Sequence, residues 1–228
     1  MSYLRDGMVV GLGTGSTADF FLRALAAALK DKQLKNIVGV ATSHQSERRA
    51  QELGIPLTTL AQSPRLDLTV DGADEVDPRL DLIKGLGGAL LREKIVAQHS
   101  DRLIIIVDAS KVVKKLGTKS PLPVEVAPFA HEIQDLFLQT LGATPTLRRS
   151  ADGTPFITDN GNYIFDCRFS GIDDAKKLGI ALREHAGVVE CGLFLGMASV
   201  ALIAGESGVE TIERAESSLG NAGTKKKK

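Results

Sequence analysis

Tryptophan is absent from this chain, and tyrosine occurs only twice among its 228 residues. Few aromatic side chains are therefore available to stack on nucleic-acid bases. The charge balance points the same way: 28 basic residues offset 28 acidic ones, and without the four lysines at the end of the sequence the balance is 24 to 28, or −4. A chain with this mildly acidic body is not expected to bind nucleic acid through a basic face.

Cysteine and long apolar runs are scarce as well. Cys167 and Cys191 lie far apart and form no C-x-x-C spacing, so the sequence predicts two buried free thiols rather than a zinc site or a disulfide framework. The apolar stretch 8–12 is too short for a signal-peptide core or a membrane span. We therefore expect a cytoplasmic protein with no membrane partner. The lysine run 225–228 is predicted to be a solvated, flexible tail.

The first half of the chain alternates short β-branched runs with longer amphipathic stretches. This βαβα pattern is typical of a parallel sheet flanked by helices, whose ligands gather at the carboxyl ends of the strands. The predicted strands are 8–12, 37–41, 66–70 and 103–107, and the predicted helices between them are 18–30 and 46–53.

The proline pair at Pro121 and Pro123 breaks this rhythm and indicates a boundary. Beyond it the pattern predicts strands from 124 and at 144–149, 156–158, 163–168 and 188–192, with helices at 130–141 and 173–184. This order favours an α+β, ferredoxin-like unit. The apolar run 198–204 is expected to return to the first sheet. We therefore predict a Rossmann-like α/β main domain (1–121 plus 193–228) and a smaller α+β lid or oligomerisation domain (122–192).

The segment GLGTGST at 11–17 follows a predicted strand and opens a helix. Its glycines allow a tight bend, while amide and hydroxyl groups converge on the positive end of the helix, where a phosphate binds well. The alternative is a structural turn in which Thr14 or Ser16 only caps the helix. A dinucleotide site is disfavoured because the second strand ends in Thr42-Ser43 rather than in a carboxylate, and a P-loop lacks its lysine.

Four carboxylates follow the strand 66–70 in the segment DGADEVD at 71–77. At that place they are suited to hold sugar hydroxyls or to relay a proton. Oxygen ligands also suit a divalent cation, although the segment matches no EF-hand loop. An acidic turn with capping aspartates is the third reading.

A lysine leads into a glycine-rich bend at 84–88, and the helix after it begins with Glu93 among its first residues. That carboxylate is placed to reach back over the loop toward a ligand held by Lys84. The opposite interpretation is that Arg92-Glu93-Lys94 forms a solvated helix face. A second lysine, Lys111, ends the segment DASK after the strand 103–107.

In this order the motifs closely resemble the type A ribose-5-phosphate isomerase family. The resemblance spans nearly the whole chain and rests on GLGTGSTA (11–18), DGAD (71–74), 84–94, DASK (108–111), PLPVEV (121–126), TDNGNY (158–163) and 187–196. It implies an enzyme of the non-oxidative pentose phosphate pathway that interconverts ribose 5-phosphate and ribulose 5-phosphate. It further implies a Rossmann-like domain with a lid, a homodimer or homotetramer, and neither cofactor nor metal. Leu86 departs from the family pattern, which has glycine there.

The same resemblance implies roles for individual residues. Glu93 is expected to be the proton acceptor, with Lys84 beside the developing oxyanion and Asp71 assisting the opening of the furanose ring. The residues implied to contact the substrate are Thr14, Gly15, Ser16, Thr17, Asp71, Gly72, Ala73, Asp74, Lys84, Gly85, Leu86, Gly87 and Lys111.

The chemistry agrees with these roles, because removing a weakly acidic proton beside a carbonyl needs a base within reach and positive partners for the oxyanion. Two rival functions stay open on the sequence alone. One is a non-catalytic sugar-phosphate sensor on the same fold, and the other is a nicotinamide-dependent oxidoreductase.

Overall fold

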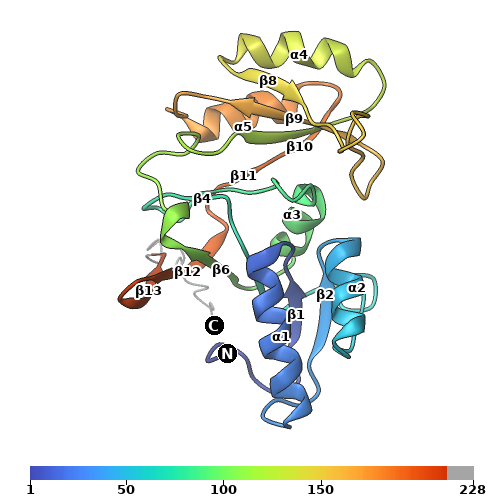
Figure 1. Cartoon of the computed structure of the whole chain (residues 1–228), viewed down its shortest axis with the longest axis vertical. Helices are drawn as coiled ribbons and strands as arrows, with labels where there is room; N and C mark the ends of the chain where they lie inside the picture. The colour runs from blue at the N-terminus through green and yellow to red at the C-terminus, as the bar shows by residue number, and fades with distance from the viewer. Residues whose placement is uncertain (215–228) are drawn as a thin grey trace, which may run out of the picture.

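A six-stranded sheet organises the larger part of the molecule (Figure 1). The computed structural model describes residues 1–214. In spatial order the strands are β13 (Gly208–Glu213), β12 (Ala198–Gly205), β6 (Leu103–Asp108), β3 (Leu68–Asp71), β1 (Val9–Leu12) and β2 (Val38–Ala41). All neighbours are parallel except the edge pair of β12 and β13. The return of the chain to this sheet at 198–204 is confirmed.

Helices cover both faces of this sheet, as the alternating pattern predicts. Val10 and Leu12 of β1 point to the face where they pack with Leu22 of α1 (Ser16–Lys30) and Ala50 of α2 (His44–Glu52). Gly11 points to the opposite face, where a side-chain carbon added to it would meet Val96 of α3 (Leu90–Gln98). The predicted helix-sheet-helix layering is therefore confirmed.

The smaller sheet is antiparallel and contains four strands. Its order is β10 (Val188–Cys191), β7 (Leu122–Val126), β9 (Tyr163–Arg168) and β8 (Thr144–Leu147). Two helices, α4 (His131–Thr140) and α5 (Ala175–Glu184), join these strands in a β-α-β-β-α-β sequence. This is the ferredoxin-like arrangement that the sequence predicts.

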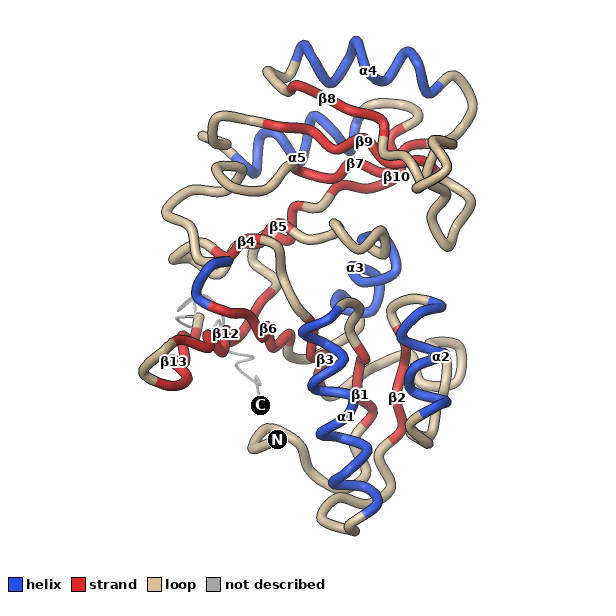
Figure 2. The backbone as a smooth tube through the Cα atoms, viewed as in Figure 1, coloured by secondary structure: helices blue, strands red, loops and turns tan. Residues whose placement is uncertain are grey.

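Three short strands connect the two larger sheets. They are β4 (Glu75–Val76), β5 (Leu82–Ile83) and β11 (Leu193–Phe194), and the 3₁₀ turn η1 (Ala109–Lys111) follows β6. Figure 2 shows the short strands, together with α3, between the six-stranded sheet and the four-stranded one. The helix that carries Glu93 thus lies where the two parts of the molecule meet.

Two predicted details of the second unit are wrong. The proline pair does not interrupt regular structure up to Val124, because β7 of the smaller sheet already begins at Leu122 and Pro123 pairs with Asp166 of β9. The strand tolerates Pro123 because β10 has already ended on its other side, where only the Pro123 carbonyl is used, by the Gly192 amide at 2.8 Å.

No strand forms at 156–158 either. After a single bridge between Arg149 and Pro155 the chain leaves the sheet, and the ring of Phe156 packs close to Gly88 of the glycine-rich loop. The sequence also missed β13 and the three short connecting strands, which are brief or highly exposed.

Both cysteines are buried free thiols, as predicted, and burial raises the pKa of each. Within residues 1–214, no helix is long and apolar enough to cross a membrane. The predicted flexible tail at 225–228 lies outside the described residues.

Candidate active site

A cavity of about 210 Å³ opens at the carboxyl edge of the six-stranded sheet. The amino end of α1, the loop after β3, the glycine-rich loop before α3 and the turn η1 surround it. Its lining consists of Thr14, Gly15, Ser16, Thr17, Gly72, Ala73, Asp74, Lys84, Gly85, Gly87, Glu93 and Lys111. Every one of these residues was predicted from the sequence. Of the predicted set, Asp71 and Leu86 lie outside the lining.

Lys84 forms the buried floor of the cavity. Its Nζ donates to the carbonyl oxygen of Gly72 at 2.6 Å and lies 3.0 Å from Oδ2 of Asp71 and 3.3 Å from Oε2 of Glu93. Burial by itself lowers the pKa of Lys84, but the two carboxylates outweigh it and raise this pKa above its ordinary value. The ammonium group is therefore permanently charged and held in one place.

Glu93 is buried in the first turns of α3 and faces this ammonium group. Its Oε2 is within ion-pair distance of Lys84 but makes no aligned hydrogen bond. Burial raises the pKa of Glu93 to about 8, against the opposing effect of Lys84. An unsatisfied carboxylate with a pKa near neutrality is suited to accept and return a proton.

The neighbours of Glu93 point in other directions. Arg92 donates to Oδ1 of Asn160 at 2.9 Å and to the carbonyl of Asp159 at 2.8 Å, both in the loop before β9. Lys94 is buried and donates to the carbonyl of Cys191 at 2.6 Å. The alternative that this helix run forms a solvated face is therefore wrong. Contacts on both sides of Glu93 fix α3 against the smaller sheet.

The loop before α1 owes its shape to Asp71. A side-chain carbon at position 13 would lie 2.6 Å from the Asp71 backbone, so only glycine fits there. The amide of Thr14 donates to Oδ1 of Asp71 at 3.1 Å. With β1 and β3 adjacent, this contact leads the chain over the end of the sheet and into α1.

The hydroxyl of Thr14 turns away from solvent. It lies 2.7 Å from the Thr42 hydroxyl and donates to the Ser43 hydroxyl at 2.8 Å. The helix begins after Gly15 without a side-chain cap, so the alternative that Thr14 or Ser16 caps α1 is wrong. The first amides of α1 have no acceptor within the helix and face the cavity end, where they favour an anion.

Asp74 and Leu86 are linked across the cavity rim. The amide of Leu86 donates to Oδ2 of Asp74 at 3.0 Å. Burial raises the pKa of Asp74, and this amide bond partly counteracts the shift. Leu86 is 40% exposed and its backbone avoids the left-handed region, which explains why the loop accepts leucine at this position.

Lys111 reaches the cavity from η1, and another lysine holds its turn in place. Nζ of Lys119 donates to the carbonyl of Ser110 at 2.7 Å and to that of Val112 at 3.0 Å, on either side of Lys111. No sequence pattern indicates this contact, because it depends on how the segment after η1 folds back.

Glu75 holds the segment 117–120, which contains Lys119, in place. It is fully buried, and its carboxylate accepts three backbone N–H groups at 2.6–2.7 Å, from Gly117, Lys119 and Ser120. One of the four acidic residues in 71–77 thus supports Lys111 indirectly. Among residues 1–214, no group of three His, Cys, Asp or Glu side chains is arranged to hold a metal ion.

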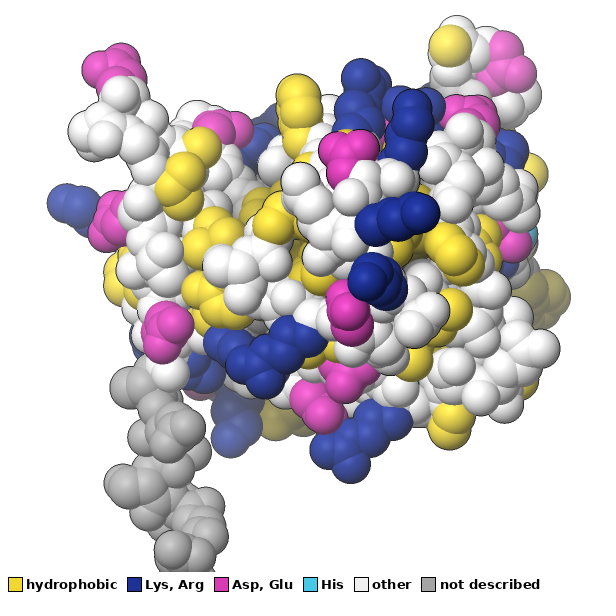
Figure 3. Space-filling view, turned by 90° about the horizontal axis from the view of Figure 1, so that it is seen from below, with side chains coloured by type: hydrophobic (Ala, Val, Ile, Leu, Met, Phe, Trp, Pro, Cys, Tyr) yellow, Lys and Arg dark blue, Asp and Glu magenta, His cyan; other side chains and the backbone are white. Residues whose placement is uncertain are grey.

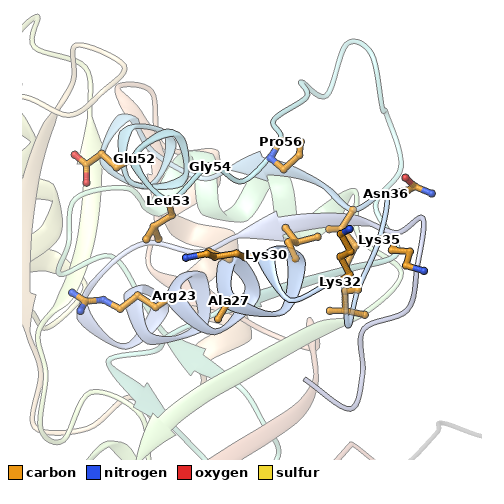
Figure 4. Close-up of a pocket in the computed structure, with 14 residues that line it drawn as sticks. Arg23, Ala27, Lys30, Lys32, Lys35, Asn36, Glu52, Leu53, Gly54 and Pro56 are labelled. Carbon is orange, nitrogen blue, oxygen red and sulfur yellow. The ribbon is translucent and has the colours of Figure 1, made fainter.

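A larger hollow of about 960 Å³ lies at the other end of α1 and is shown in Figure 4. Its basic side chains come from α1 (Arg23 and Lys30) and from the loop after it (Lys32 and Lys35). This hollow lies beside the carboxyl end of α1, and a helix carboxyl end carries partial negative charge that repels anions. Figure 3 shows that acidic side chains are interspersed with basic ones on the face of the molecule seen from below. The smaller cavity, with its buried acid and base, is therefore the better candidate for chemistry.

Comparison with known proteins identifies the family. The model of the family "Ribose 5-phosphate isomerase A (phosphoriboisomerase A)" matches residues 38–208. The chain belongs to the ribose-5-phosphate isomerase A family. It is 54% identical over 213 residues to ribose-5-phosphate isomerase A of Roseiflexus castenholzii, covering 93% of this chain and 91% of that one. The Desulfatibacillum aliphaticivorans member is 52% identical, with 94% of each chain covered.

Solved structures of ribose-5-phosphate isomerases share the whole fold. A D-ribose-5-phosphate isomerase in complex with phospho-erythronic acid superposes with a TM-score of 0.92 at 42% identity, covering 93% of both chains. The isomerase A of Methanocaldococcus jannaschii gives 0.88 at 41% identity, covering 92% of both. These matches confirm the predicted fold class and the resemblance read from the motifs.

Proposed function

We infer that the protein is an aldose-ketose isomerase that interconverts D-ribose 5-phosphate and D-ribulose 5-phosphate through an enediolate. The single observation that carries this function is the pairing of the buried Glu93 carboxylate with the Lys84 ammonium, 3.3 Å apart, in a cavity that also contains the amino end of a helix. The family match supports the same substrate pair. The activity belongs to the non-oxidative pentose phosphate pathway.

The substrate's phosphate is assigned to the amino end of α1. Gly15, Ser16 and Thr17 supply backbone amides and two hydroxyls there, and Lys111 lines the same cavity with a positive charge. Binding the phosphate at this end directs the other end of a five-carbon sugar toward Lys84 and Glu93. The neighbouring carboxylate Asp74 is assigned to the sugar hydroxyls between them.

The reaction then needs one base and one oxyanion partner. Ionised Glu93 takes the proton from C2 of the open aldose, the electron pair moves into the C1–C2 bond, and the carbonyl oxygen becomes an oxyanion facing Lys84. Glu93 then returns the proton to C1. The C2 hydroxyl loses its proton as the carbonyl forms at C2, and that proton ends on the oxygen of C1, which becomes the new hydroxyl. A single carboxylate serves both transfers because C1 and C2 are adjacent.

Asp71 is proposed to assist the opening of the furanose ring. It is bound to the Lys84 ammonium at 3.0 Å and lies beneath the cavity lining, so its influence on the substrate passes through Lys84. Two loops are proposed to enclose the sugar. They supply the remaining predicted contacts: Gly72, Ala73, Gly85, Leu86 and Gly87. No cofactor or metal enters any step of this scheme.

The proposal also includes the domain bounds, the oligomeric state and the location of the protein in the cell. Residues 1–121 plus 193–228 are proposed as the catalytic domain, of which 215–228 lie outside the described residues, and 122–192 as the lid. A homodimer or homotetramer follows the family resemblance. A cytoplasmic location is the one expected of an enzyme in central sugar metabolism.

The test is to incubate purified protein with ribose 5-phosphate in the presence of a chelator and to follow formation of ribulose 5-phosphate. Ketose formation at an enzymatic rate is the expected result. Binding of the sugar phosphate without turnover would instead favour the non-catalytic sensor. Activity that depends on added magnesium would revive a metal site in the acidic segment.

A further inference from the structure

Arg148, which directly follows β8 in the smaller sheet, binds the glycine-rich loop. Its Nη1 donates to two consecutive carbonyl oxygens, those of Gly85 and Leu86, at 3.1 Å each. The rest of its guanidinium forms a two-pronged ion pair with Asp166 of β9. The side chain is only 13% exposed, so this contact is built into the junction between the two parts of the molecule.

This contact determines where the following amide points. In a planar trans peptide the C=O of one residue and the N–H of the next are directed to opposite sides. Because Arg148 holds the Leu86 carbonyl, the N–H of Gly87 is directed away from Arg148. Gly87 lines the cavity together with Lys84 and Glu93. An N–H that turns away from Arg148 and the smaller sheet therefore turns toward the cavity.

The neighbouring amides of the loop are already used, whereas that of Gly87 is not. The Leu86 amide donates to Asp74, and the Gly88 amide donates to the Gly85 carbonyl at 3.0 Å. Among residues 1–214, none accepts a hydrogen bond from the Gly87 amide. The Gly87 N–H is therefore a free donor beside the catalytic pair.

We propose that Arg148 is a positioning residue: by binding the Leu86 carbonyl, it aims the Gly87 N–H at an oxygen of the enediolate. The inference rests on the proposed isomerase function. The positive guanidinium also withdraws charge from the Leu86–Gly87 peptide, which makes its N–H a stronger donor. A donor fixed in advance stabilises developing charge without reorganisation, and one such donor is typically worth ~10²–10³ in turnover.

Because Arg148 is anchored by Asp166, the smaller sheet takes part in the chemistry without contacting the substrate. Asp166 fixes the guanidinium, the guanidinium fixes the loop, and the loop fixes the donor. If Arg148 only held the fold together, its loss would lower stability but leave kcat and KM of the folded enzyme unchanged.

The kinetic test compares Arg148→Met, Arg148→Lys and the control Arg149→Met. Arg149 is the adjacent arginine, and its Nη1 donates to the Gly153 carbonyl within its own turn. Arg148→Met is expected to lower kcat for ribose 5-phosphate at least ~10-fold with KM changed less than ~3-fold, part of the effect of losing one oxyanion donor. Arg148→Lys should recover part of the loss, and Arg149→Met should match the parent enzyme.

A spectroscopic test follows the Gly87 amide directly. In ¹⁵N-labelled protein titrated with phospho-erythronic acid, the Gly87 N–H resonance should move downfield in the parent enzyme and in Arg149→Met. In Arg148→Met this shift should be much smaller, although the resonances at the amino end of α1 still respond to the ligand. An unchanged Gly87 shift in Arg148→Met would overturn the proposal.

The possible failures are distinguishable. If the parent enzyme does not isomerise ribose 5-phosphate, the proposed function fails. If the parent is active and folded Arg148→Met keeps its kcat, or loses only in KM, the positioning role fails. If Arg148→Met does not fold, Asp166→Asn is the substitute, because it keeps the volume of the side chain but weakens the two-pronged ion pair with Arg148. A parent-like kcat together with a parent-like Gly87 shift in Asp166→Asn would also reject the positioning role.

Discussion

The ammonium of Lys84 lies between two buried carboxylates but is shared unequally, 3.0 Å from Asp71 and 3.3 Å from Glu93. Asp71 also accepts hydrogen bonds from the amides of Thr14 and Gly72. In the part of the chain that the structure describes, Oε2 of Glu93 accepts no such hydrogen bond. One cation between two buried carboxylates leaves an excess negative charge, and the less supported carboxylate is the one that takes a proton near neutral pH.

Replacing the base should separate binding from chemistry. Glu93→Gln keeps the shape of the side chain but cannot accept a proton, so we expect kcat to fall by at least ~10²-fold. Binding of phospho-erythronic acid, measured by calorimetry, should change little. Glu184→Gln, on the exposed end of α5, is the matched control and should behave as the parent. Parent-like turnover in Glu93→Gln would remove Glu93 from the mechanism.

The pH dependence of the reaction should show the raised pKa of Glu93. The base works only when ionised, so kcat/KM is expected to increase with pH through an apparent pKa near 8, far above the ordinary value of 4.5. The second ionisation of the substrate's phosphate, near pH 6, lies below this window. Measuring kcat/KM between pH 5 and 10 checks this, and a profile that is already flat at pH 6 would contradict it.

Part of the cavity was predictable because the segments that follow parallel strands lie together at one edge of the sheet. Parallel strands end at the same edge of a sheet, so the segments that follow β1, β3 and β6 had to converge, and the residue types in them had a shared chemical meaning. The cavity residues from positions 14–17 and 72–74 and Lys111 follow these three strands, whereas Lys84, Gly85, Gly87 and Glu93 were implied by the family resemblance. Recognising the strands therefore predicted the part of the site that follows β1, β3 and β6, but not the part that the glycine-rich loop and α3 supply.

Contacts that depend on the junction between the two sheets were not predictable. Arg148 meets the Gly85 carbonyl across 63 positions of sequence, and no periodicity indicates such a distance. Glu75 read as one more carboxylate in an acidic turn, whereas three backbone amides of a later segment define its role. Pro123 was misjudged because its tolerance depends on where a neighbouring strand ends.

The cation at the phosphate end should contribute to binding more than to chemistry. Lys111→Met removes a charge from the cavity wall but leaves Glu93 and Lys84 in place, so we expect KM to increase about 10-fold, equivalent to ~1.4 kcal/mol, with kcat reduced much less. The effect should shrink at high salt, which screens a partly exposed charge. Lys114→Met, at an exposed neighbouring position, is the control. A loss confined to kcat would instead place Lys111 beside the reacting carbons.

The raised pKa of Glu93 should also make the stability of the fold depend on pH. Stability should fall as the pH rises, whereas kcat/KM should increase. The pKa of Glu93 is 4.5 in an ordinary environment and about 8 in the folded protein, so between these values the folded state binds the extra proton. Glu93 therefore stabilises the fold below about pH 4.5, and this contribution is lost as the pH rises through 8. In Glu93→Gln the dependence disappears, since glutamine resembles the protonated acid at every pH.

The measurement is thermal unfolding of both proteins from pH 5 to pH 9. At pH 5 the two unfolding temperatures should nearly coincide. At pH 9 the variant should unfold on the order of 5 °C or more above the parent, because each kcal/mol corresponds to roughly 2–4 °C in a chain of this size. Glu184→Gln should follow the parent throughout. A difference between Glu93→Gln and the parent that stays constant with pH would show that the carboxylate at position 93 titrates as it does in the unfolded chain, and the raised pKa that prepares it as a base would have to be abandoned.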